Sequence, residues 1–182
     1  YGIVTDVCLK RKIRNYVELV KGDSEGYMIY VKEGSVLNNS HQLAYDRTGI
    51  AKKDKGKVSK EDIQILRKFM CDNFYDIRTF GAVMSLEVNC GIVRGPIQIN
   101  FARSIDPIFQ QEVTITRMAV ANEKDADKKT TEMGRKFVVP YGLYKAEGYI
   151  SAALAQNVSG FSEKDLDLFW EAIINMFEHD HS

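Results

Sequence analysis

The most regular alternation of apolar and polar side chains lies between Gly91 and Pro107. Ile97, Ile99 and Phe101 fall on one side of this stretch, and Gln98, Asn100 and Ala102 fall on the other. This two-residue period predicts a β-strand with one buried face, ended by the Gly95–Pro96 pair and by Pro107. Because Arg94 and Arg103 flank the strand, two interpretations stay open. It is an ordinary sheet strand with one face in solvent, or the floor of a groove that binds a polyanion.

Apolar residues recur at helical spacing in three segments. The first helix is expected from Thr5 or Asp6 to about Lys21, and its apolar stripe contains Leu9, Ile13, Tyr16, Val17 and Val20. Ser59 and Ser162, each followed three residues later by an aspartate, predict the start of two further helices. The last helix carries Leu166, Phe169, Trp170, Ile173, Ile174 and Phe177 on one face. We therefore expect Trp170 in the core.

The first helix also carries a cluster of cations, Lys10, Arg11, Lys12 and Arg14. Lys10 and Arg14 lie one turn apart at the edge of the apolar stripe, and Glu18 is the local acid that can relieve their repulsion. The cluster is either a solvated face whose lysine stems lie along the core, or a set of phosphate contacts.

Residues 32–58 are polar and have no apolar period, so we expect a mobile insertion there. It carries Lys52, Lys53, Lys55 and Lys57, and His41 is expected on its surface. A short strand is expected before it, at Tyr27–Val31.

Two alternating segments bracket a charged tract at Asn122–Thr131 and predict a protruding hairpin over residues 112–140. Its arms mix cations with apolar side chains, namely Arg117, Met118, Met133, Arg135 and Lys136. Phosphates favour cations and an unstacked base favours an apolar surface, so the mixture suits a wedge for nucleic acid.

Composition indicates one globular domain, with 182 residues of which 45% are hydrophobic and 27% charged. No run approaches a membrane span or a signal peptide, and the separated cysteines Cys8, Cys71 and Cys90 fit a reducing cytoplasm. The net charge is zero, which argues against a simple basic DNA-coating protein. Residues 1–121 nevertheless hold 18 Lys and Arg against 14 Asp and Glu, a balance that suits a basic ligand face.

Catalytic motifs are absent: the sequence has no Walker loop, no GxSxG and no HExxH. The run Glu178-His179-Asp180-His181 is disfavoured as a metal site, because adjacent side chains on a helix point apart. Asp106 is interpreted as a turn residue rather than a general base. We expect no enzymatic activity, no metal and no cofactor.

Several blocks of sequence together resemble the CRISPR-associated Cas-seven family, in particular the Csd-type backbone subunit of the type I-C surveillance complex, Cascade. The blocks are Gly2–Asn15, Arg78–Met84, Arg94–Gln98, Phe101–Ile108, Ile115–Val120 and Met133–Tyr144. The resemblance implies an α+β fold over residues 1–182, with an RNA-recognition-motif-like (ferredoxin-like) palm, an inserted helical region and a thumb hairpin. It also implies a first and a final strand beyond the two ends of this sequence.

The function implied is binding of CRISPR RNA without catalysis, in antiviral defence. Copies of such a subunit line up along the guide in a helical filament with other Cascade subunits, and the guide pairs with target DNA. An endoribonuclease of the RAMP superfamily, acting through Asp106 or His179, is the alternative.

The resemblance assigns guide contacts to Leu9, Lys10 and Arg14 in the first helix. In the thumb it assigns them to Arg117, Met133, Arg135 and Lys136. We add Arg11 as a member of the same cation cluster, and Arg94 and Arg103 from the strand argument.

Overall fold

The computed structural model describes residues 1–22, 24–51, 58–85, 88–121, 123 and 131–178. The chain forms two compact units. One contains Tyr1–Val4 and Phe101–Ala146, and the other contains Thr5–Asn100 and Glu147–Ser182. We call them the strand unit and the helical unit. No helix among the described residues is both long and apolar enough to cross a membrane.

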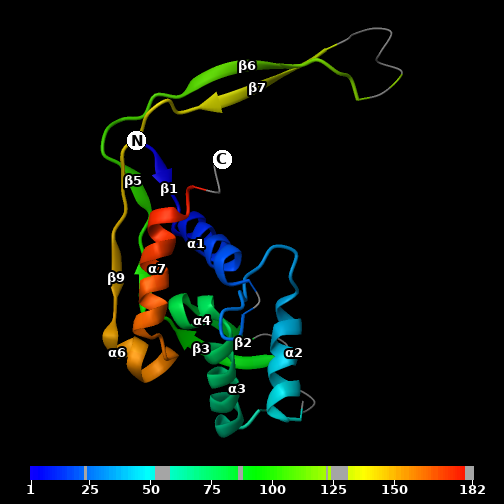
Figure 1. Cartoon of the computed structure of the whole chain (residues 1–182), viewed down its shortest axis with the longest axis vertical. Helices are drawn as coiled ribbons and strands as arrows, with labels where there is room; N and C mark the ends of the chain where they lie inside the picture. Colours follow the sequence, from blue (N-terminus) through cyan, green and yellow to red (C-terminus); the bar gives the residue numbers. More distant parts are fainter. Residues whose placement is uncertain (23, 52–57, 86–87, 122, 124–130, 179–182) are drawn as a thin grey trace. The chain divides into compact units, whose positions relative to one another are not determined.

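Over its described residues, the helical unit combines four longer helices with two antiparallel strand pairs (Figure 1). Its helices are α1 (Asp6–Lys21), α2 (Leu37–Thr48), α3 (Lys60–Asn73), α4 (Tyr75–Phe80), α6 (Ala152–Leu154) and α7 (Glu163–Asn175), with a π-helical turn at Ala155–Ser159. Its strands are β2 (Gly81–Ser85), β3 (Asn89–Arg94), β4 (Ile97–Ile99) and β9 (Gly148–Ile150). Strand β2 pairs with β3, and β4 pairs with β9.

The predicted helix starts are confirmed. The Thr5 hydroxyl accepts from the Cys8 backbone at the start of α1, and the Ser59 hydroxyl accepts from the Asp62 backbone at the start of α3. At α7, Ser162 and Asp165 form a reciprocal capping box. Each cap satisfies a backbone N–H that has no partner within its own helix, which is why the sequence signal was reliable.

The main core lies between α2, α3, α4 and the β2–β3 pair. Its buried residues are Tyr30, Ala44, Tyr45, Leu66, Met70, Cys71, Phe74, Ile77, Met84, Val88, Cys90 and Val93. The segment 32–58 thus contributes a packed helix where the sequence showed no apolar period. The lysines at 52, 53, 55 and 57 lie outside the described residues.

The prediction that His41 lies on the surface is wrong, because its side chain is 0% exposed. His41 occupies the inward stripe of α2 together with Leu37, Ala44 and Tyr45, at helical spacing. Its Nε2 lies 2.8 Å from the Tyr30 hydroxyl, and the two rings stack. Because a polar residue, His41, occupies one position of the buried stripe, the apolar period of this helix is not evident in the sequence.

The expected strand at Tyr27–Val31 is replaced by a single bridge from Met28 to Phe74. The backbone amides of Tyr30 and Val31 donate instead to the carboxylate of Asp76, at 2.8 and 3.1 Å. With those donors already satisfied by a side chain, the segment does not extend into a ladder.

Helix α7 packs on α1 through a narrower face than its sequence suggested. Leu168, Phe169 and Ala172 are buried, whereas Trp170 is 48% exposed, so the prediction of a core tryptophan is wrong. Trp170 is two residues from both Leu168 and Ala172, and because an α-helix turns by about 100° per residue, this spacing directs the Trp170 side chain away from the buried stripe.

The strand unit contains a three-stranded sheet and a long hairpin. The sheet consists of β1 (Ile3–Val4), β5 (Ala102–Ser104) and β8 (Tyr144–Lys145), with β5 in the centre. The hairpin pairs β6 (Gln111–Arg117) with β7 (Glu132–Val138), two long strands that run side by side in Figure 1. It falls in the segment for which the sequence predicts a hairpin.

The alternating stretch around Asn100 does not form one strand. Strand β4 ends at Ile99, β5 begins at Ala102, and the division between the two units falls after Asn100. The Asn100 amide donates to the Glu147 carbonyl, and Phe101 is 58% exposed rather than on a buried face. The expected continuous floor, with Arg94 and Arg103 at its ends, is therefore split between two units.

Candidate nucleic-acid interface

Two of the predicted cations lie over one aromatic ring. Lys10 and Arg14 are one turn apart on α1, and their charged groups lie 5.6 and 5.3 Å from the centroid of the Phe80 ring. Phe80 is the last residue of α4 and is half-buried, with its ring edge-on to Phe169. The electron-rich face of the ring favours cations above it, so the three side chains hold one another in place.

The two cations are partnered differently. Lys10 forms an ion pair with Asp6 at 2.8 Å on the helix surface, and the hydrogen bond from Lys10 lowers the pKa of the Asp6 carboxyl. Arg14 donates through Nε to Asp76 at 2.8 Å, and the Asp76 side chain is 1% exposed. Glu18, the expected local partner, pairs with Lys32 instead. Repulsion within the cluster is thus offset by carboxylates that the fold brings to it.

The hydrogen bond to Asp76 fixes the orientation of the Arg14 guanidinium and still leaves donor nitrogens for a ligand. Asp76 already accepts the amides of Tyr30 and Val31, so its charge is stabilised from three directions. Only Nε of Arg14 is used in this contact, and the two terminal nitrogens of the guanidinium remain for another acceptor. Such a preoriented guanidinium suits a phosphate oxygen.

The other cations of the cluster point to the protein itself. Arg11 donates through a terminal nitrogen to the Val31 carbonyl at 2.7 Å. Lys12 is buried and lies over the Phe177 ring at 5.4 Å. Within this cluster, the structure therefore brings Lys10 and Arg14 together and directs Arg11 and Lys12 elsewhere.

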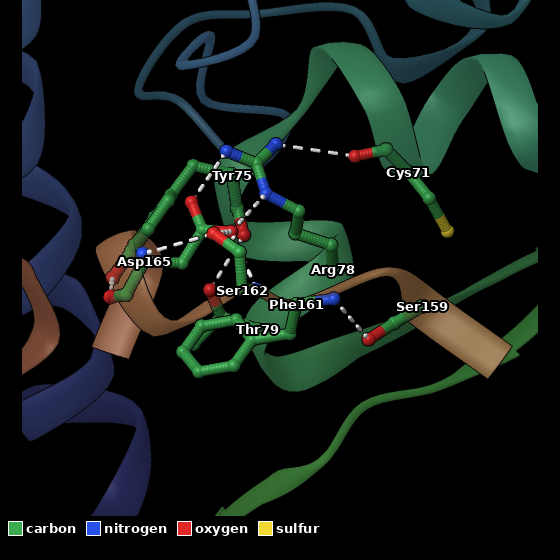
Figure 2. Close-up of polar contacts among 8 residues, drawn as sticks. All are labelled: Cys71, Tyr75, Arg78, Thr79, Ser159, Phe161, Ser162 and Asp165. Atoms are coloured by element: carbon green, nitrogen blue, oxygen red, sulfur yellow. Dashed lines mark hydrogen bonds and ion pairs between the residues drawn. The ribbon is translucent and has the colours of Figure 1, made fainter. Parts of the chain in front are cut away.

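A buried network holds α4, and with it Phe80, against the start of α7 (Figure 2). Arg78 donates to both carboxylate oxygens of Asp165, at 3.1 and 2.8 Å, and to the Cys71 carbonyl at 3.1 Å. The Tyr75 hydroxyl donates to the Asp165 carbonyl at 2.9 Å. Burial raises the pKa of Asp165, but hydrogen bonds from Arg78 and Ser162 outweigh it and leave the pKa lowered. Asp165 is therefore ionised at neutral pH and paired.

Two glycines let the backbone approach closely just after Phe80. A Cβ on Gly95 would lie 2.2 Å from the Phe80 carbonyl carbon, and a Cβ on Gly81 would lie 2.4 Å from the Val93 carbonyl oxygen. Gly81 also has a φ of 79°, in the left-handed region. Arg94, between these contacts at the end of β3, is exposed.

The remaining predicted residues belong to the strand unit. The register of β6 and β7 pairs Arg117 with Glu132, Val113 with Lys136, and Thr116 with Met133. Arg117 and Lys136 consequently share one face of the hairpin, whereas Met133 and Arg135 share the other. Arg117 pairs with Glu132, and Arg135 pairs with Glu112 at 3.1 Å. The sequence did not reveal the two faces, because the register depends on the turn.

Of the two groups considered for catalysis, the structure describes only Asp106. Asp106 is exposed in a bend after β5, and His179 and Asp180 lie outside the described residues. Over the part of the chain that the structure describes, no three His, Cys, Asp or Glu side chains gather in a group able to hold a metal ion.

Sequence reasoning missed the roles of Phe80 and Asp76. The ring of Phe80 lies beneath two cations that are at least 66 residues away in sequence, so no local pattern indicates this contact. Asp76 has no charged neighbour in sequence except Arg78, and its partner Arg14 is 62 residues away. The only local signal was the short segment Tyr75–Phe80 ahead of Gly81, which combines two aromatic residues with Asp76.

Helices packed on short antiparallel strand pairs define an α+β protein. The chain belongs to the Cas7 family, since the family model described as CRISPR-associated protein Cas7 matches residues 1–182. A chain of a solved "CRISPR RNA-guided surveillance complex, pre-nicking" has a similar fold, with a TM-score of 0.54 and 14% identity over 96% of this chain. This chain spans 63% of the length of that one. No curated protein matches it.

Proposed function

We propose that this chain is the guide-RNA-binding backbone subunit of a type I-C, Csd-type Cascade complex. The observation that carries the proposal is the pair Lys10 and Arg14, one turn apart over Phe80, in a chain of the Cas7 family. Two cations held together on one helix can neutralise phosphates of a single strand.

Lys10 can exchange its partner for a phosphate at little cost. Its ion pair with Asp6 is between side chains that are each 23% exposed. Pairs of this kind contribute about 0–1 kcal/mol, so losing Asp6 is offset by a charge-assisted contact to phosphate. Arg14 keeps Asp76 and uses its terminal nitrogens.

The hairpin supplies a second type of contact. One of its faces combines Lys136 with Val113, and the other combines Arg135 with Met133 and Phe137. Each face thus offers a cation beside exposed apolar side chains. A hairpin with this composition can displace a base and hold the phosphates on both sides of it.

In this proposal the chain has an RNA-recognition-motif-like palm and a thumb at 112–140. Copies line up on CRISPR RNA in the cytoplasm as a filament with other Cascade subunits. The guide, and not the protein, pairs with target DNA. The subunit itself is not catalytic, so RNA incubated with it and magnesium stays intact, and an Asp106→Ala variant behaves identically.

The salt dependence of RNA binding tests the phosphate contact. Binding of a fluorescein-labelled CRISPR RNA is measured by anisotropy over a range of salt concentrations. Because each phosphate contact to a single strand contributes about 0.7 to the slope of log affinity against log salt, Lys10→Gln should flatten the slope by about that amount.

Lys68→Gln is the matched control. Lys68 also pairs with an aspartate one turn away, Asp72, at 2.8 Å, but on α3. This variant should keep the wild-type slope. Equal slopes for Lys10→Gln and the wild type would refute the assignment of α1. Arg14→Ala is less informative, since it leaves the buried Asp76 charge without its arginine.

A further inference from the structure

The exposed face of the three-stranded sheet in the strand unit carries cations beside apolar side chains, and the contacts proposed above do not involve this face. Strand register places Ile3, Arg103 and Lys145 directly beside one another across β1, β5 and β8. All three are exposed, whereas the neighbours of Arg103 in β5, Ala102 and Ser104, are buried on the opposite face. This alternation places Arg103 on the exposed face of the sheet and its two neighbours in β5 on the buried face.

Apolar side chains border the cations on this face. Phe101 and Ile105 precede and follow Arg103 at two-residue spacing and are 58% and 53% exposed. The Arg103 guanidinium lies 5.2 Å from the centroid of the Tyr1 ring, which is itself exposed. The result is two accessible rings beside an arginine, on a strand whose positions on this face carry no carboxylate.

We infer that this face binds single-stranded nucleic acid, with a base stacked on Phe101 and the adjacent phosphate paired with Arg103. Aromatic rings offer a surface that any base can use, and arginine pairs with phosphate through two parallel hydrogen bonds. Tyr1 holds the guanidinium in place by the cation–π contact. Lys145 adds positive charge beside it. The inference rests on the proposed RNA-binding function and assigns to it a second contact surface.

The charge on the face favours a nucleic acid over a second copy of the chain. A protein interface on this face would need an acidic group to match Arg103, or would leave its guanidinium buried without a counter-charge. A polyanion supplies that charge and covers the rings.

The test measures binding of labelled oligouridine, which forms no secondary structure, to the full chain by fluorescence anisotropy. Phe101→Ala should weaken binding about 5- to 150-fold, the range for loss of one stacked base. Arg103→Gln should flatten the salt slope by about 0.7. Phe109→Ala and Arg47→Gln are control variants, because both are exposed side chains that belong to none of the strands β1, β5 and β8. Both should bind like the wild type.

A photo-crosslinking arm gives a direct readout. RNA carrying 5-iodouridine should crosslink to the peptide that contains Phe101. If the wild type binds oligouridine while Phe101→Ala and Arg103→Gln bind equally well, this inference is overturned and the proposed function stands. If the wild type binds no RNA, both are overturned. If Phe101→Ala lowers the assembly mass with unchanged RNA affinity, the face is a protein interface and the inference is wrong.

Discussion

The pairing of Arg78 with Asp165 offers the sharpest test of how the helical unit is held together. Their side chains are 8% and 5% exposed, and the bonds between them join α4 to the start of α7. Arg78→Met keeps most of the aliphatic stem but removes the guanidinium, whose carbon lies 5.3 and 5.4 Å from the centroids of the Tyr27 and Tyr75 rings. The substitution therefore removes mainly the charge and its hydrogen bonds.

We expect Arg78→Met to lower the free energy of unfolding by about 3–5 kcal/mol, because it leaves a buried carboxylate without its counter-charge. For a chain of this size, that loss lowers the Tm by about 6–20 °C. Ser162 still donates to Asp165 through its amide and hydroxyl, at 2.9 and 2.8 Å, which favours the lower half of the range.

A second substitution separates lost charge from lost packing. Asp165→Asn in the Arg78→Met background neutralises the unpaired carboxylate, so the double variant should be more stable than Arg78→Met alone. Urea unfolding followed by circular dichroism measures the wild type, the single variants Arg78→Met and Asp165→Asn, and the double variant. Arg47→Met, on an exposed arginine, serves as a control and should stay within about 0.5 kcal/mol of the wild type. The reasoning would be refuted if the destabilisations caused by the two single substitutions simply added in the double variant. It would also be refuted if Arg78→Met lowered the free energy of unfolding by less than about 1 kcal/mol.

Two further predictions concern stability. Burial lowers the pKa of His41 below the 6.5 of an unfolded histidine, against a smaller opposing interaction with the Val88 backbone. The unfolded chain thus binds this proton more tightly. The free energy of unfolding should fall as the pH drops from 6.5 towards the folded pKa, and His41→Phe should flatten that segment; parallel profiles would contradict it. Gly95→Ala should cost about 1–3 kcal/mol or more, since its Cβ would meet the Phe80 backbone. Gly134→Ala, whose Cβ would meet only Ile115 at 3.6 Å, should be tolerated in the same thermal melts.

Local chemistry accounts for what the sequence predicted well. Helix starts at Thr5, Ser59 and Ser162 depend on contacts within four residues, so they could be read directly. The hairpin arms carry a two-residue period on both sides of a polar tract, which also needs no distant partner. The likeness to a known family, carried by several blocks, agrees with the family match over residues 1–182.

Tertiary structure decided the rest, because those features depend on partners far away in sequence. The sequence shows that residues 10–14 are cationic, but only the fold brings Asp76 to Arg14 and places Phe80 beneath it. The alternation at 97–102 predicts strand backbone, yet pairing with β9 on one side of Asn100 and with β1 on the other splits it into two units. A two-residue period fixes which side chains share a face, and a neighbouring strand decides whether that face is buried or exposed.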